Sequence, residues 1–118
     1  MIIESADWCE RSQVFKDVID SSSSELDQLL IVNIEHRMKN RDSALMNYRP
    51  KTAGYPWYGI IAPESKTLIC SSTDGDQPNI GFPLYDDGKR RFAQFLRKAL
   101  PNTTDSALNK ILERFDSN

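Results

Sequence analysis

The sequence is poor in the residues that mark several protein classes. Its 118 residues include two cysteines, one histidine and five glycines. Cys9 and Cys70 do not make a disulfide framework, and the single His36 has no cysteine or second histidine at metal-ligand spacing. The chain has no glycine-rich phosphate loop, no Gly-x-Ser-x-Gly elbow and no Asp-x-Asp-x-Asp-Gly calcium loop. We therefore expect no metal site and no cofactor.

Charge and hydropathy argue against further classes. The chain has 15 basic and 17 acidic side chains, a formal net charge of -2, which gives no reason to expect nucleic acid or an anionic membrane as a partner. No apolar run approaches the roughly 20 residues that span a bilayer. No basic segment followed by an apolar one marks a secretory signal. We expect a cytoplasmic protein whose residues 1–118 form one domain.

The chain does contain a regular alternation of strand and helix patterns. β-Branched and aromatic runs predict strands at Met1–Glu4, Ile31–Ile34, Trp57–Ala62 and Thr67–Cys70. Apolar residues at helical spacing predict one helix from Cys9 to about Ile19 and another over Phe92–Leu100, with a weak helix between His36 and Arg49.

Two more helical segments are expected near serine and threonine residues. The run Ser21–Ser24 interrupts the first helix and can cap a second short one, with Leu26, Leu29 and Leu30 facing inward. A last helix follows Pro101, with three candidate caps: Thr103, Thr104 or Asp105.

The resulting order of elements is β-α-β-α-β-β-α-α. Two strands joined through a helix are parallel with a right-handed crossover, and the hairpin at the third and fourth strands adds antiparallel pairing. We therefore predict an α/β fold with a four-stranded mixed sheet, helices on both faces and an extra helix at the C-terminus.

The stretch Ser5-Ala6-Asp7-Trp8-Cys9 lies where the first strand leads into the first helix. Free backbone N–H groups and the positive end of the helix dipole favour an anion at this position. A thiolate at Cys9 is therefore easier to form than in water. This position makes Cys9 the candidate nucleophile of the chain.

A Trp-Cys pair before such a helix resembles the active-site turn of the thioredoxin superfamily, which reads Trp-Cys-x-x-Cys. Gly54-Tyr55-Pro56 matches the Gly-x-Pro of that family, and the resemblance implies that Pro56 is cis and lies against Cys9. Residues 78–83 and the helix after them look like the tail of bacterial thioredoxin-like proteins. The resemblance covers about Ile2 to Leu112 and implies a three-layer α-β-α thioredoxin-like fold.

Three departures from the family pattern bear on function. Ser12 replaces the resolving cysteine and cannot release a mixed disulfide. Ile3 occupies the place of the family's buried acid, and Glu4 should point to the opposite face. The leading strand and helix of the family are missing, which leaves Ile31–Ile34 at a sheet edge where a second copy can pair. The sequence thus predicts a possible homodimer through this strand.

Two functions remain open. The first is a monothiol thiol-disulfide oxidoreductase in which Cys9 is the nucleophile, Ser12 donates a hydrogen bond to its thiolate, and protein thiols or glutathione are the partners. Its predicted substrate-binding residues are Trp8, Arg11, Tyr55, Pro56 and Trp57. The second is a redox-inactive thioredoxin-like module that binds a protein or peptide in the groove around Trp8, Tyr55 and Pro56.

Overall fold

The computed structural model describes residues 1–45, 47–75 and 77–116. In chain order its elements are β1 (Ile2–Ser5), α1 (Glu10–Ser21), β2 (Val32–Glu35), α2 (Arg41–Leu45), β3 (Trp57–Ile61), β4 (Leu68–Ser71), α3 (Asp86–Ala99) and α4 (Asp105–Asp116). The strands and most of the helices lie where the sequence patterns predict them, with boundaries that differ by a few residues. The exception is α3, which begins at Asp86 and not at the predicted Phe92.

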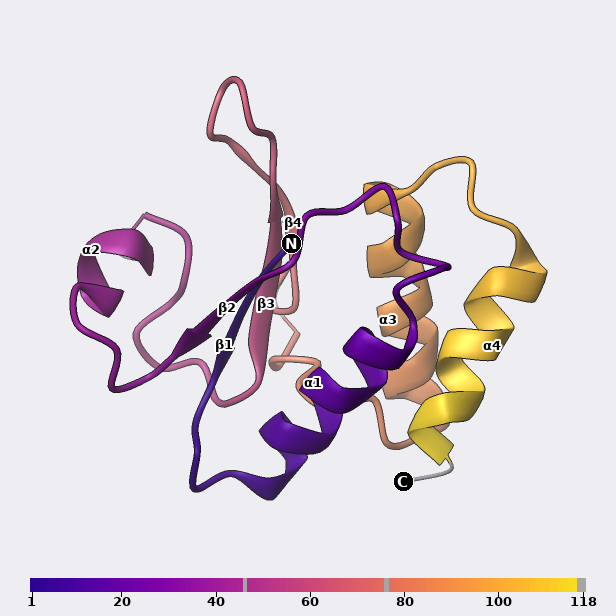
Figure 1. Cartoon of the computed structure of the whole chain (residues 1–118), viewed down its shortest axis with the longest axis horizontal. Coiled ribbons are helices and arrows are strands. Elements are labelled where there is room, and N and C mark those ends of the chain that lie inside the picture. The colour runs from indigo at the N-terminus through magenta and orange to yellow at the C-terminus, as the bar shows by residue number, and fades with distance from the viewer. Residues whose placement is uncertain (46, 76, 117–118) are drawn as a thin grey trace.

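The strands form one mixed sheet in the order β2-β1-β3-β4 (Figure 1). β1 and β2 pair in parallel, with Ile2 opposite Val32. β3 pairs antiparallel with β1 and β4, with Ile3 opposite Tyr58. This pairing confirms the predicted directions. It also places β1 inside the sheet, so that the Trp8-Cys9 turn begins at the end of an interior strand.

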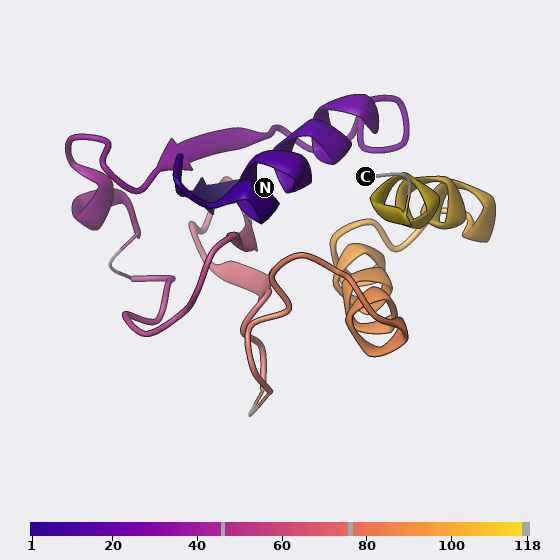
Figure 2. The same ribbon diagram turned by 90° about the horizontal axis from the view of Figure 1, so that it is seen from below.

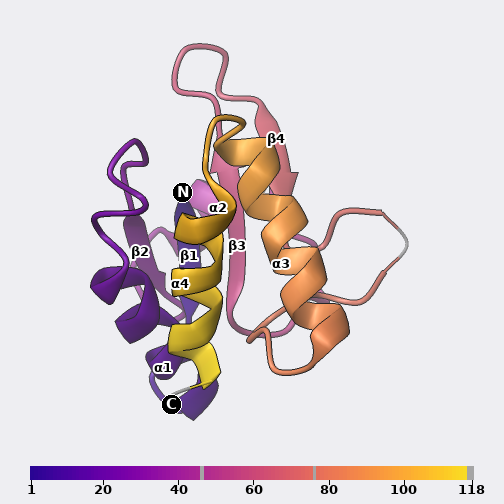
Figure 3. The same cartoon turned by 90° about the vertical axis from the view of Figure 1, so that its right-hand side faces the viewer.

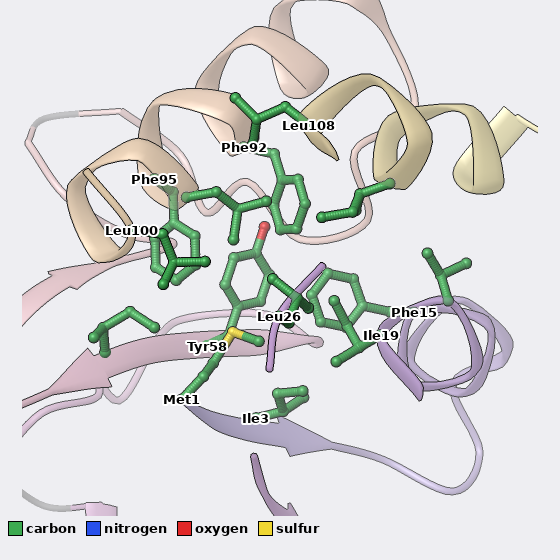
Figure 4. Close-up of a cluster of buried hydrophobic side chains, with 14 of the residues drawn as sticks. Met1, Ile3, Phe15, Ile19, Leu26, Tyr58, Phe92, Phe95, Leu100 and Leu108 are labelled. Atoms are coloured by element: carbon green, nitrogen blue, oxygen red, sulfur yellow. The ribbon is translucent and has the colours of Figure 1, made fainter. Parts of the chain in front are cut away.

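Helices cover the two faces of the sheet unequally. The helices α1, α3 and α4 lie together on one face, while the short α2 lies on the other (Figures 1 and 2). The larger core fills the three-helix face, where Phe15 of α1 stacks on Tyr58 of β3 with ring centroids 4.6 Å apart. Figure 4 shows Tyr58 among Phe15, Phe92 and Phe95. A smaller cluster on the α2 face contains Ile34, Leu45 and Trp57.

The segment between α1 and β2 differs from the prediction. No helix forms at residues 22–31, and Leu30 is 81% exposed, although Leu26 is buried as expected. The reason is local: the Ser22 hydroxyl donates to the Val18 carbonyl at 2.8 Å and its N–H to the Ile19 carbonyl at 3.0 Å. These bonds end α1, and the chain then continues in turns.

The exposed edge next to this segment agrees with the prediction. β2 pairs only with β1 among the described strands, and Val32 on it is 42% exposed. The strand thus leaves backbone groups open on its outer side. A homodimer through this edge stays a prediction.

α4 begins at one of the three predicted caps. Thr104 accepts a hydrogen bond at its side-chain oxygen from the Ala107 N–H at 3.1 Å, which satisfies a free N–H of the first turn. α4 then packs beside α1 and α3 (Figure 3). Within the described part of the chain, no helix combines the length and apolar character needed to cross a bilayer.

Candidate functional site

Cys9 is the N-cap residue of α1. Its backbone is extended (φ −98°, ψ 105°), its N–H donates to the Ala6 carbonyl at 3.0 Å, and its carbonyl accepts from the Gln13 N–H at 3.3 Å. The Gln13 side-chain amide also donates to the Ala6 carbonyl, at 2.9 Å, and so holds the turn closed. The Cys9 thiol is free, partly exposed and makes no capping hydrogen bond. It therefore lies at the positive end of the helix dipole, as predicted.

Trp8, the residue before Cys9, forms an aromatic group with His36 and Tyr55. The Trp8 ring meets the His36 and Tyr55 rings edge-on, each with centroids 5.8 Å apart, and the His36 and Tyr55 centroids are 5.7 Å apart. Trp8 is 63% exposed. The Trp8-Cys9 turn and the Gly54-Tyr55-Pro56 segment, which are distant in the sequence, thus meet through the Trp8–Tyr55 contact.

Hydrogen bonds fix the ring of His36 on both sides. The Trp8 indole N–H donates to His36 Nε2 at 3.1 Å. Because an indole nitrogen can only donate, Nε2 is an acceptor without a proton. The proton of the neutral ring is then on Nδ1, which donates to Glu35 Oε1 at 2.5 Å. Two hydrogen bonds therefore connect the residues in one direction: Trp8 donates to His36, and His36 donates to Glu35. Trp8 is the residue before Cys9.

The Glu35 carboxylate anchors this chain. Partial desolvation acts to raise its pKa, but hydrogen bonds from the backbone N–H groups of Arg37 (2.6 Å) and Asp7 (3.2 Å), together with His36, keep the pKa of Glu35 below its ordinary value. Glu35 is thus ionised at neutral pH. It holds the Asp7-Trp8 end of the turn as well as the histidine.

Among the described residues, one group of possible metal-ligating side chains lies close together: Asp7, Glu35 and His36. One ligand atom from each lies within 4.8 Å of the other two. Hydrogen bonds account for the His36 and Glu35 atoms, and an ion pair to Arg37 at 3.4 Å engages Asp7. These contacts explain the arrangement, and we assign no metal to it.

A buried ion-pair cluster supports Tyr55 from the other side. Glu4 of β1 is fully buried and forms ion pairs with Arg41 (Nε to Oε2, 2.6 Å) and with Arg49. The Arg49 guanidinium lies 4.9 Å from the Tyr55 ring centroid, and Arg41 donates to the Tyr55 hydroxyl at 3.4 Å. As predicted, Glu4 lies on the face opposite Ile3, where it fixes Tyr55 through two arginines.

The predicted site residues divide into two groups. Cys9 and Trp8 are adjacent, Tyr55 contacts Trp8, and Arg11 is exposed on the first turn of α1. Ser12 is fully buried, and its hydroxyl makes no hydrogen bond to any described residue, so the predicted bond to the thiol is not formed here.

Pro56 and Trp57 lie deeper than expected. The Tyr55-Pro56 bond is cis, as the family resemblance implies, and Pro56 is buried. Trp57 is fully buried and donates its indole N–H to Thr73 at 3.2 Å. This position corrects the prediction that Trp57 lines a substrate groove: its strand turns the side chain into the cluster with Ile34 and Leu45.

Four supporting residues were not predicted from the sequence: Glu35, His36, Arg41 and Arg49. A signal for the first two was present, because the ends of parallel strands meet at one edge of a sheet. Glu35 is the last residue of β2 and His36 follows it, beside the end of β1. A signal for the arginines was Glu4, a charged residue in an otherwise apolar strand that needs a partner once buried.

A comparison with family models, curated proteins and solved structures finds no match to this chain.

Proposed function

We propose that this chain is a thioredoxin-like protein that exchanges thiols and disulfides through one nucleophile, Cys9. The observation that carries the proposal is the position of Cys9, whose free and partly exposed thiol lies at the N-cap of α1. The Ser12 hydroxyl is fully buried and has no hydrogen-bond partner among the described residues. Ser12 follows Cys9 by three residues at the start of α1, and a thiolate at Cys9 gives its hydroxyl an acceptor.

The surroundings of Cys9 support the same chemistry. The thiol is free and partly exposed at the first turn of a 12-residue helix. Unpaired N–H groups and the helix dipole stabilise a thiolate there. The Trp8–Tyr55 contact brings the Trp-Cys turn to the Gly-x-Pro segment, the pairing that the resemblance to thioredoxins implies. Both features favour an attacking sulfur over a packing residue.

The exchange needs an outside thiol. The Cys9 thiolate attacks one sulfur of a substrate disulfide, the Cys9–sulfur bond forms, and the second substrate sulfur leaves as a thiolate. Ser12 cannot attack this mixed disulfide. A second thiolate, from a protein or from glutathione, then attacks the sulfur bound to Cys9 and releases Cys9 as a thiolate. Each disulfide broken is replaced by one formed, so no further oxidant is needed.

Three exposed or partly exposed side chains can hold the substrate. Trp8 and Tyr55 offer apolar surface beside Cys9, and Arg11 offers a cation on the first turn of α1. Glutathione carries carboxylates that suit such a cation. The substrates that fit are therefore glutathione disulfide and mixed disulfides of protein thiols.

The test is the reaction of the Cys70→Ala protein with oxidised glutathione, followed by mass spectrometry. We expect one glutathione on Cys9 that reduced glutathione removes. Ser12→Ala should slow formation of the adduct about tenfold, because a hydrogen bond to a charged group contributes about 1.5–3 kcal/mol. Ser23→Ala, a change at an exposed serine, is the control and should leave the rate unchanged. An equal rate in Ser12→Ala, or no adduct, contradicts the proposal.

The second candidate function is peptide binding without thiol exchange, and the 63% exposure of Trp8 favours it. Exposed tryptophans are common anchors at interfaces. Cys9→Ser separates the two functions, because it abolishes exchange and leaves a peptide surface at Trp8 and Tyr55 intact.

A further inference from the structure

A pocket of about 260 Å³ lies at the other edge of the sheet. It opens between the end of β4, the loop after it and the outer side of α3, elements that lie side by side in Figure 3. It is lined by Ser71, Asp74, Gln77, Ile80, Arg90, Arg91, Gln94, Phe95 and Lys98. β4 is two strands from β1 in the sheet, and none of these residues belongs to the Cys9 site.

The lining of this pocket is basic although the chain as a whole is acidic. It contains the cations Arg90, Arg91 and Lys98 and, among the described residues, the single carboxylate of Asp74. That carboxylate is engaged: its oxygens accept from the Ser71 N–H at 2.9 Å and from the Ser71 hydroxyl at 3.1 Å. Asp74 keeps its negative charge but is bonded within the turn after β4, and the three cations of α3 outnumber it among the described lining residues.

Arg91 and Lys98 lie on the same side of α3 because of helical spacing. Arg91, Gln94 and Lys98 are at positions i, i+3 and i+7 of α3, along the margin of its buried face. Arg90 pairs with Asp87 on the same helix. Neither Arg91 nor Lys98 forms an ion pair with any residue in the described ranges. Both positive side chains line the pocket from the same side of α3 and are available to a ligand.

We propose that this pocket binds the phosphate group of a small organic phosphate. A guanidinium presents a planar fork of donors that matches phosphate oxygens, and an ammonium adds a second charge for a dianion. The amides of Gln77 and Gln94 supply further donors, and Ile80 and Phe95 give an apolar patch for the organic part. The volume is just below the ~300 Å³ of the smallest typical ligand pockets, so the ligand is small.

Titration of the full chain with phenyl phosphate tests this inference, with binding followed by backbone amide shifts in NMR spectra. We expect saturable shifts at Ser71, Gln77 and residues of α3. Arg91→Gln and Lys98→Gln should each weaken binding about tenfold, since each removes a charged hydrogen bond. Arg97→Gln is the matched control: Arg97 is on the same helix, pairs with Asp105 at 2.6 Å and does not line the pocket.

Each other outcome overturns the inference. Absence of saturable shifts at millimolar phenyl phosphate excludes the site, and equal weakening by Arg97→Gln shows general attraction to a basic helix. Benzoate that binds as tightly as phenyl phosphate shows that the pocket selects a ring or a single charge rather than a phosphate. Retained amide spectra of the free variants confirm that they fold. The Cys9 reaction is independent of every one of these results.

Discussion

His36 determines where Trp8 lies. The only histidine of the chain accepts the Trp8 indole N–H at Nε2 and donates to Glu35 from Nδ1. A half-exposed tryptophan in a turn would otherwise adopt several rotamers. The histidine therefore holds the aromatic side chain next to Cys9 in the chain, and in the proposed thiol exchange it acts as a positioning residue.

We expect His36→Ala to slow glutathione adduct formation at Cys9 about fivefold, the effect of losing one hydrogen bond of roughly 1 kcal/mol. The Trp8 indole N–H signal should move and its exchange with solvent should become faster, which NMR measures directly. His36→Gln, whose amide oxygen can accept the indole N–H, should restore part of both properties. Unchanged indole exchange in His36→Ala would show that Trp8 is held by its ring contacts alone.

Glu4 connects β1 to the segment around α2: its partner Arg41 lies 37 residues further along the chain. It brings the carboxylate of β1 to Arg41 at the start of α2 and to Arg49 after it. Among the described residues, the apolar cluster on this face of the sheet is small and centres on Ile34, Leu45 and Trp57. The ion pairs therefore link the segment around α2 directly to the interior strand β1.

Glu4→Gln should lower the free energy of unfolding by about 3 kcal/mol, because it leaves two arginines, one of them nearly buried, without their shared carboxylate. Urea denaturation measures the change. Glu10→Gln, an exposed position on α1, should change it by less than about 0.5 kcal/mol. A loss below about 1 kcal/mol in Glu4→Gln would mean that solvent replaces the ion pairs.

The order of the strands along the chain and the directions of their pairing could be predicted from the sequence, because short apolar runs and helical spacing are local signals. The position of Cys9 at a helix start followed from the same signals. The fate of Leu30 did not, since a backbone turn built by Ser22 outweighs the leucine spacing. Trp57 was misplaced for another reason: which face of a strand is covered, and by what, depends on residues distant in the chain.

Across the whole molecule, α4 closes the larger core against the segment that follows α1. Arg114 of α4 donates to the Ser22 hydroxyl at 2.9 Å and pairs with Glu25 at 2.7 Å. The hydrogen bond from Arg114 is the main reason why the pKa of Glu25 lies below its ordinary value of 4.5, against the opposing effect of desolvation. The contact thus joins α4 to the segment after α1, and the titratable group in it is the Glu25 carboxylate.

Because folding lowers the pKa of Glu25, its contribution to stability is present above about pH 4.5 and is lost as the pH falls through the folded value. Glu25→Gln should therefore be less stable than the parent protein at neutral pH, and the difference should shrink on acidification. Thermal unfolding from about pH 6 to about pH 3 measures this.

Glu64→Gln, at an exposed turn, is the control and should follow the parent protein throughout. A stability difference for Glu25→Gln that stays constant over the range would assign its effect to packing rather than to charge.

The contrast between the two tryptophans gives the molecule two separate optical reporters. Trp8 is 63% exposed beside Cys9, whereas Trp57 is fully buried in the sheet. Iodide in solution reaches the first indole and not the second, and the emission of the first lies at longer wavelength. A disulfide formed at Cys9 by the proposed reaction would change the quenchable component, and unfolding would change the protected one. The proposed reaction and loss of the fold could therefore be followed in one unlabelled sample.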